Sequence, residues 1–477
     1  MKNIKFIIII LLAGVILSCS EDYLNPIPSS GITSASYYKN ADEVETALIS
    51  IYDGIQGINS TSTQDLHAIQ FEYYLTEMRS DNTRTKSQEG EAAQFEFYNV
   101  EANNGIVSNY YGSFFNVIMR ANVVLDNLSV IDNADQLAAF EAEAKFLRAY
   151  AYFNLVRLFG DLPLIDSVIT PLDKEIQFTR QPVSEIYSLI EGDLETAVAG
   201  LDNSYKTRAS KAAAQALLAK VYLTHSKNYS AAQGLCEDII GSGFSLMTNF
   251  NDVFYSERND EIIFAIGFES GLTADSQNFS AEFLNGVGRT VGVNYVTQDA
   301  AAALDNFGGD RAMYSYRIDP FQVSQRQVTK YLPDGKDGGA DGKTFEEGDP
   351  RLAGNDWIVL RYADVLLMHV EAIMAGAAET SSSNALTSFN EVRNRAGLDD
   401  DEDGTITVEE LLLERRVELA FENQRLFDLI RLGQAETVLS QFSADNGLGY
   451  SSTDLLLPIP QREINLSQGL MSQNPGY

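Results

Sequence analysis

Apolar side chains recur every three or four residues over most of the chain, which is the spacing of amphipathic helices. The clearest case is the segment from Tyr362 to Ala375. Its apolar face carries Ala363, Leu366, Leu367, Val370 and Met374. The same periodicity predicts helices over residues 41–58, 71–78, 109–128, 137–159, 182–201, 210–224, 229–240, 383–396, 408–422 and 425–433. The pattern therefore predicts a mainly α-helical protein.

Residues 243–357 break this pattern. Gly, Asn, Asp, Ser and aromatic residues dominate there, the short apolar run Ile262 to Ile266 is typical of a strand, and the segment 334–348 holds five glycines. We expect a single domain, 34–477, in which a helical scaffold (34–242 and 358–477) carries this insertion of loops and short strands.

The scaffold helices occur in pairs joined by short turns. Small residues at Ala212, Ala213, Ala216 and Ala219 suit close helix crossings, so the pairs resemble tetratricopeptide (TPR) units. No strict repeat is present, and an irregular helical bundle is the alternative. About four such pairs are expected.

The N-terminus has the features of an export signal. Lys2 and Lys5 precede an apolar run, Ile7 to Leu17, that is too short to span a bilayer well. The run ends in Ser18 and Cys19, which resembles a lipobox. We therefore predict a signal peptide at 1–18, lipidation of Cys19 and a tether at 19–33; an ordinary secretory signal is the alternative.

The formal net charge is −33, which disfavours nucleic acid as a partner. It also disfavours anionic polysaccharides unless a local basic patch intervenes. Of two cysteines, Cys19 would carry lipid, leaving Cys236 without a partner for a disulfide. Its apolar neighbours predict a buried, unreactive side chain.

Five motifs resemble the SusD/RagB family, in the order in which that family has them. They are RYADVLLM (361–368), FNEVRNRAGL (389–398), ERRVELAFENQRLFDLIRLG (414–433), LLLPIPQREI (455–464) and QNPGY (473–477). Members of this family are outer-membrane nutrient-binding lipoproteins of Bacteroidetes.

The resemblance implies a SusD-like fold and a lipid-anchored protein on the outer membrane, facing the cell exterior. It implies capture of an oligosaccharide and its delivery to a SusC-like TonB-dependent transporter, without enzymatic activity. Two alternatives keep the same architecture: a protein that binds peptides, and a TPR-like adaptor that binds only proteins.

Ligand-binding residues of the family come from the loop after a Ser-Asp pair, here Ser80 and Asp81, and from the central insertion. Aromatic faces and polar rims are what a sugar site needs. The candidates are Asp81, Asn82, Arg84, Phe97, Tyr98, Tyr295, Tyr314 and Tyr331. The only tryptophan, Trp357, sits beside an apolar run and is expected to be buried.

The segment from Asp399 to Glu410 has the spacing of an EF-hand calcium loop, with Gly404 at the sixth position. Its oxygen ligands would be Asp399, Asp401, Asp403, Thr405 and Glu410. The alternative is a solvated acidic loop, and Gly397 ends the entering helix earlier than an EF-hand requires. Calcium would be structural, and no organic cofactor is expected.

No catalytic motif is evident. The three histidines lack metal-ligand spacing, and the sequence has no phosphate loop or nucleophile elbow. A glycosidase needs only two carboxylates, so the family resemblance is the stronger argument against an enzyme. The charged residues around the ERR motif are expected to form ion pairs between helices. They are Arg415, Arg416, Glu418, Arg425, Asp428 and Arg431.

Overall fold

The computed structural model describes residues 37–477 apart from 61, 63–64, 88, 285–292, 321, 333–349 and 402. The predicted signal peptide, Cys19, the tether and the glycine-rich segment 334–348 lie outside these residues. Within the described part, no helix combines the length and apolar character that crossing a membrane requires.

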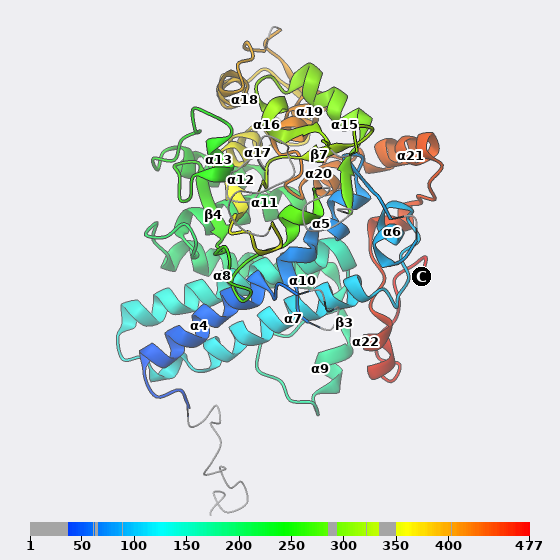
Figure 1. The fold of residues 1–477 in the computed structure, drawn as a ribbon. Helices are drawn as coiled ribbons and strands as arrows, with labels where there is room; N and C mark the ends of the chain where they lie inside the picture. Colours follow the sequence, from blue (N-terminus) through cyan, green and yellow to red (C-terminus); the bar gives the residue numbers. More distant parts are fainter. Residues whose placement is uncertain are drawn as a thin grey trace, which may run out of the picture.

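Eight helices of the described chain form the scaffold, each packed against the next (Figure 1). They are α4 (Ala41–Gln56), α7 (Gly105–Asp126), α8 (Ala134–Phe159), α10 (Val183–Gly200), α11 (Lys211–Thr224), α12 (Tyr229–Ile240), α17 (Tyr362–Met374) and α18 (Ser383–Arg395). The contact between α12 and α17 continues the series across the insertion. This serial packing confirms the predicted mainly helical, TPR-like scaffold.

Polar side chains set where the scaffold helices begin. Asn40 accepts a hydrogen bond from the Glu43 amide at 3.1 Å, and Asn104 accepts from the Ile106 amide at 2.9 Å. Ser210 caps α11 in the same way. These caps satisfy amides that have no partner within the helix, so each helix has a defined first turn.

The predicted helix at 71–78 is wrong, because the segment is broken into single turns. These turns are η1 (Ala68–Phe71), α5 (Glu72–Leu75) and η2 (Glu77–Arg79). Thr76 interrupts the helix: its backbone lies at φ −124° and ψ −74°, and its hydroxyl donates to the Glu72 carbonyl at 2.8 Å. The chain then turns into the polar loop that begins at Ser80.

Ten short strands in the described residues form five antiparallel pairs. These are β1 (Thr83–Thr85) with β5 (Asn294–Val296), β2 (Leu162–Pro163) with β3 (Arg180–Gln181), β4 (Ile262–Ile266) with β8 (Trp357–Arg361), β6 (Tyr316–Ile318) with β7 (Arg326–Val328), and β9 (Glu379–Thr380) with β10 (Ile406–Thr407). The strand predicted at 262–266 is confirmed. Its pairing with β8 brings the two ends of the insertion together, so α17 can follow the N-terminal helices directly.

The other helices belong to the insertion, the connections and the C-terminal region. They are α6 (Glu91–Glu96), η3 (Leu128–Val130), α9 (Lys174–Phe178), α13 (Asp252–Tyr255), α14 (Phe279–Glu282), α15 (Gln298–Phe307), α16 (Arg311–Ser315), η5 (Pro350–Leu352), α19 (Val408–Glu418), α20 (Arg425–Arg431), α21 (Ala435–Asn446), η6 (Ser452–Leu455) and α22 (Gln461–Leu466). The insertion thus contains helices that the sequence pattern does not predict. The longest, α15, forms because Thr297 caps it and its alanine-rich face is buried.

Buried ion pairs join the insertion to the C-terminal region. Arg361 contacts Glu418 at 2.5 Å, Glu422 at 2.8 Å and Glu261 at 2.8 Å. Burial alone would raise the pKa of Glu418, but the surrounding guanidinium groups hold it well below its usual range. Glu418 is therefore charged, and removal of one partner would leave a buried charge unpaired.

A second set of ion pairs confirms the predicted contacts between helices. Arg415 on α19 lies 2.9 Å from both Asp364 of α17 and Asp428 of α20. Arg431 at the end of α20 lies 2.9 Å from Glu371 of α17. The motif residues that resemble the SusD/RagB family therefore hold three helices in a fixed arrangement.

Candidate functional site

A cavity of about 730 Å³ opens between the β1–β5 pair, the β6–β7 hairpin and helices α15, α19, α20 and α21. We call it the Tyr295 cavity. Its lining comprises Asp81, Arg84, Tyr295, Val296, Thr297, Gln298, Asp299, Ser324, Arg326, Arg416, Arg425, Thr437, Val438, Gln441, Phe442, Asp445 and Asn446. The volume is within the range of ligand pockets.

Strand pairing positions one wall. The antiparallel register sets Arg84 of β1 opposite Tyr295 of β5. The Arg84 guanidinium is held from two sides, at 2.5 Å from Glu96 and with a 2.7 Å hydrogen bond to the Asn446 side chain. Burial raises the pKa of Glu96, although the Thr85 amide and Arg84 favour its charged form. Arg84 therefore presents a fixed cation beside the Tyr295 ring.

The floor is built on Asp81. Its carboxylate accepts two hydrogen bonds from Arg425, at 2.8 and 2.9 Å, and lies 3.0 Å from Arg416. Burial works to raise the pKa of Asp81, but the two arginines outweigh it and lower that pKa strongly. The Asp81 carbonyl accepts from the Thr297 hydroxyl at 2.9 Å, which ties the floor to the start of α15.

Two aromatic side chains supply apolar surface within this polar frame. Tyr295 enters from β5 and Phe442 from α21, and both are only partly buried. A half-exposed ring in a concave site can pack against an apolar face of a ligand while nearby amides and guanidinium groups hydrogen-bond to its edges.

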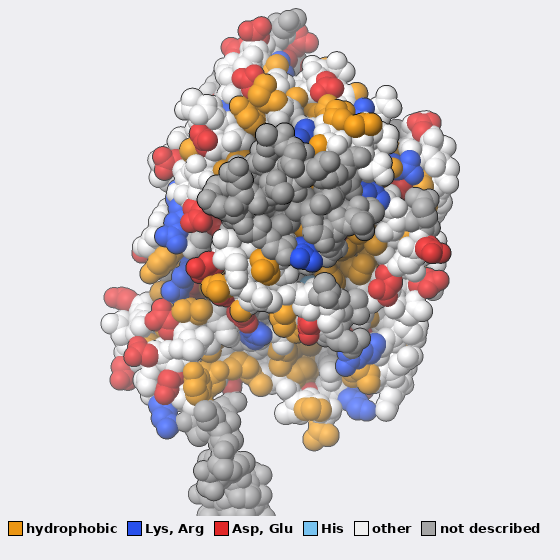
Figure 2. All heavy atoms as spheres, in the orientation of Figure 1, with side chains coloured by type: hydrophobic (Ala, Val, Ile, Leu, Met, Phe, Trp, Pro, Cys, Tyr) orange, Lys and Arg blue, Asp and Glu red, His pale blue; other side chains and the backbone are white. Residues whose placement is uncertain are grey.

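The cavity differs from the rest of the surface in charge. Its lining has four arginines and three aspartates, whereas the whole chain carries −33. Figure 2 shows acidic side chains scattered over the visible face, with basic ones between them. The near balance of charge in the cavity suits an uncharged ligand with many hydroxyl groups.

Three of the eight predicted ligand residues, Asp81, Arg84 and Tyr295, come together in this cavity. Asn82 lies next to it, where its side chain accepts from Arg416 at 3.0 Å. Asp81, Asn82 and Arg84 are close together in sequence, and the β1–β5 pairing brings the distant Tyr295 beside them.

The other four predicted residues do not line the cavity. Phe97 is half-buried at the end of α6, and Tyr98 is buried with its hydroxyl on the Arg79 carbonyl at 3.0 Å. Tyr314 is half-buried on α16. Tyr331 lies in the core, and its hydroxyl donates to a backbone carbonyl at 2.9 Å, so protein covers its ring faces.

The core also contains Trp357, whose predicted burial is confirmed: its ring centroid lies 5.4 Å from that of Tyr331. Cys236 is fully buried, as predicted, and burial raises the pKa of its thiol. Neither side chain can contact a ligand at the surface.

Sequence reasoning missed the contribution of α21 and the β6–β7 hairpin. Phe442, Gln441 and Asn446 reach the cavity from one helix, and Arg326 reaches it from β7. Phe442 is an aromatic residue among polar ones on a short C-terminal helix, and this pattern could have marked it as a candidate ligand residue. Nothing in the local sequence indicates that this helix packs beside β1.

The structure places the residues of the predicted calcium loop in a hydrogen-bonded turn. The Thr405 amide donates to Asp401 at 3.1 Å and to Asp403 at 2.8 Å. Glu410 instead caps α19, accepting from the Thr407 amide at 2.8 Å and hydroxyl at 2.7 Å. Among the described residues no group of three or more His, Cys, Asp or Glu has a metal-binding arrangement. The calcium site stays a prediction.

The three histidines have structural contacts. His67 lies with its ring nitrogens 2.8 and 2.7 Å from two backbone carbonyls, and His225 stacks on Tyr187 with ring centroids 4.1 Å apart. His369 is buried and lies 2.8 Å from the Ser388 hydroxyl. None of them lines the Tyr295 cavity.

Comparison with known families matches both blocks of the scaffold. Residues 337–477 match the family model described as "SusD family". Residues 33–223 match a model described as "Starch-binding associating with outer membrane". The two matches do not overlap.

Individual proteins resemble the chain over most of its length. SusD-like protein P2 of Formosa agariphila is 28% identical over the whole of both chains. Starch-binding protein SusD of Bacteroides thetaiotaomicron is 26% identical over 76% of each chain. The solved structure of a laminarin-binding SusD-like protein is 25% identical, with a TM-score of 0.75, and the match covers 92% of this chain and 100% of the other.

Proposed function

Because this chain belongs to the SusD family, we propose that it captures an oligosaccharide outside the cell and delivers it to a SusC-like TonB-dependent transporter of the outer membrane. Proteins of this family bind glycans and are not enzymes. The proposed mechanism is reversible capture in the Tyr295 cavity followed by release toward the transporter, with no covalent step.

The observation that carries the proposal is the combination of aromatic and polar groups in one cavity. Tyr295 and Phe442 offer ring surfaces for the apolar C–H faces of a sugar. Arg84 and Asn446 are fixed by their mutual hydrogen bond of 2.7 Å, so they are preorganised to meet ring hydroxyls.

The names of the relatives support a carbohydrate ligand. The Bacteroides thetaiotaomicron relative is called starch-binding, and the structural relative is called laminarin-binding. The N-terminal family description includes association with the outer membrane. We infer that a lipid on Cys19 provides this association, since the lipobox-like segment directly precedes that residue.

The test is affinity gel electrophoresis of the purified protein against a panel of neutral polysaccharides, followed by calorimetry with oligosaccharides from any that retard it. We expect at least one glycan to retard the protein without release of reducing ends. Release of reducing ends would instead indicate a hydrolase.

Failure of every glycan to retard the protein would overturn the proposal. A peptide library screened on the same protein would then distinguish a protein that captures peptides from an adaptor that binds only other proteins. Delivery is tested separately, by co-purification of the lipidated protein with an outer-membrane transporter from detergent-solubilised membranes.

A further inference from the structure

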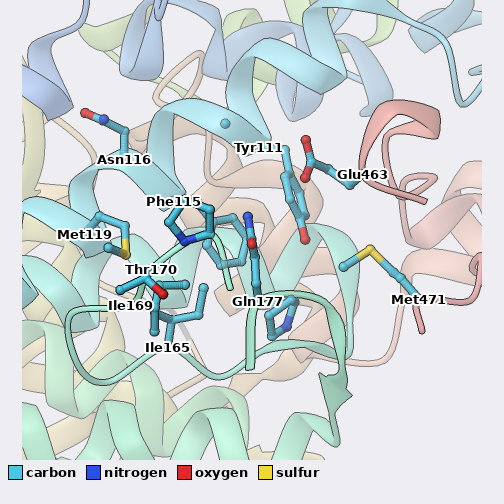
Figure 3. A pocket seen from close by; sticks show the side chains of 13 residues that line it. Tyr111, Phe115, Asn116, Met119, Ile165, Ile169, Thr170, Gln177, Glu463 and Met471 are labelled. Carbon is cyan, nitrogen blue, oxygen red and sulfur yellow. The ribbon is translucent and has the colours of Figure 1, made fainter. Parts of the chain in front are cut away.

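A second cavity, of about 380 Å³, lies between α7, the segment 163–177 and the C-terminal region that includes α22 (Figure 3). We call it the Tyr111 cavity. It shares no lining residue with the Tyr295 cavity. Nothing in the proposed capture of oligosaccharide uses it.

Most of the lining is apolar. Tyr111 and Phe115 lie one helical turn apart on α7, with ring centroids 4.7 Å apart and planes at 42°. Met119 of the same helix and Ile165 from the facing segment complete this surface. Such a lining favours the apolar part of a small ligand over a sugar, whose hydroxyl groups would lose their hydrogen bonds to water.

Tyr111 is buried, with 4% of its surface exposed, yet its hydroxyl has no hydrogen-bond partner among the described residues. An unpaired buried hydroxyl lowers stability, because its lost hydrogen bonds to water are not replaced. A polar group of a ligand in the cavity would supply the missing partner.

Glu463 adds a negative charge to the cavity from α22. Its half-buried carboxylate makes no hydrogen bond or ion pair within the described chain, and Figure 3 shows it directed toward Tyr111. Burial raises the pKa of Glu463. Burial is also the main cause of the raised pKa of the Tyr111 hydroxyl, and the charge of Glu463 adds to it, so the two groups are close enough to interact. Arg462 acts on this carboxylate through its charge, but no cation of the described chain pairs with it directly.

We propose that the Tyr111 cavity binds a small organic ammonium ion with an apolar body. The ammonium group pairs with Glu463 and lies against the Tyr111 ring, where cation–π attraction adds to the ion pair. The apolar body packs on Phe115 and Ile165. An anion would be repelled both by Glu463 and by the net charge of −33, and a neutral ligand would leave Glu463 without a direct ion-pair partner.

The test compares ligands that differ only in charge. Tyramine carries an aromatic body, a phenol and an ammonium group; tyrosol has a neutral hydroxyl in place of the amine. We expect calorimetric titration of the purified protein to show at least a tenfold preference for tyramine. A parallel comparison of glucosamine with glucose shows whether a sugar body is accepted.

Glu463→Gln keeps the shape of the side chain and should abolish the preference for the amine. The matched control is Glu379→Gln, at an exposed carboxylate outside the cavity, and this variant should keep the preference for the amine. Phe115→Ala should weaken the binding of tyramine and of tyrosol to the same extent. Circular dichroism checks that each variant is folded.

A preference for tyramine over tyrosol that disappears in Glu463→Gln supports the site. Equal binding of tyramine and tyrosol, a preference that persists in Glu463→Gln, no binding of tyramine, or binding of glucosamine in place of tyramine overturns it. Tyr295→Ala should leave tyramine binding intact, so failure of this proposal and failure of glycan capture are separate results.

Discussion

Asp81 and Arg425 are 344 positions apart in the sequence, yet they form a two-point ion pair, with Nε 2.8 Å from Oδ1 and Nη2 2.9 Å from Oδ2. The pair joins the loop after the broken helix at 71–78 to the helix that follows the ERR motif. It also forms the floor of the Tyr295 cavity. This contact thus links the family motif to the geometry of the site.

Replacement of Asp81 by Asn should destabilise the protein by about 3–5 kcal/mol, because Arg416 and Arg425 would lose a buried counter-charge. Chemical denaturation measures the change. Asp445→Asn, at an exposed aspartate of the same cavity, is the matched control and should stay within about 0.5 kcal/mol of the original protein. A loss below about 1 kcal/mol for Asp81→Asn would contradict this account.

Tyr295→Ala and Phe442→Ala should each weaken binding of the retained glycan at least tenfold, which corresponds to about 1.4 kcal/mol of lost ring contact. Calorimetry with the same oligosaccharide gives the affinities. Tyr205 is an exposed tyrosine outside the cavity, so Tyr205→Ala should bind as the unaltered protein does. Unchanged affinity in both cavity variants would place the glycan elsewhere.

Stability should depend on pH through Glu72 and Glu77. Burial raises the pKa of each from 4.5 to about 7, although Arg157 near Glu72 favours the charged form. A raised folded-state pKa means that the folded protein holds the proton more tightly than the unfolded chain does. The resulting stabilisation is complete below pH 4.5 and is lost as the pH rises toward 7.

Each glutamate should contribute about 3 kcal/mol to this loss, by the relation between pKa shift and free energy. Glu72→Gln removes one titrating group while retaining its shape, so its free energy of unfolding should fall less between pH 4.5 and 7. Urea titrations at several pH values measure the difference. An identical pH profile for the variant would show that Glu72 titrates normally.

Cys19→Ala should release the protein from the membrane fraction, because no acyl chain could then be attached. Cys236→Ala is the control: that thiol is fully buried in the scaffold, so its loss should leave anchoring intact. Fractionation and mass spectrometry of the N-terminus provide the readout. A Cys19→Ala protein that is still acylated and membrane-bound would contradict the prediction that the protein is a lipoprotein.

The predicted calcium loop can be tested by calorimetric titration with calcium after treatment with chelator. The prediction expects saturable binding at extracellular affinities, lost in Asp401→Asn/Asp403→Asn. Binding must also draw Glu410 away from its cap on Thr407, so Thr407→Val should change the affinity. If no heat of binding is measured at millimolar calcium, the predicted calcium site is wrong and Glu410 serves only to cap the helix.

The scaffold could be predicted because helical periodicity is local. The segment Tyr362–Met374 carries its own apolar stripe, and the helix predicted to end at Gly433 is followed there by a left-handed glycine with φ +71°. The motifs around 361–368 and 414–433 also indicated the SusD/RagB family, which the comparisons confirm. Prediction failed at 71–78, where a threonine hydroxyl competes for a carbonyl that a helix would use.

The sequence by itself determined the helices of the scaffold, the faces that they bury and the family to which the chain belongs, since each depends on the order of neighbouring residues. Only the tertiary structure decided that Tyr295 and Phe442 share a cavity while Tyr331 is enclosed in the core. The reason is that strand register and helix packing bring together residues hundreds of positions apart. Local side-chain chemistry carries no record of such distant partners.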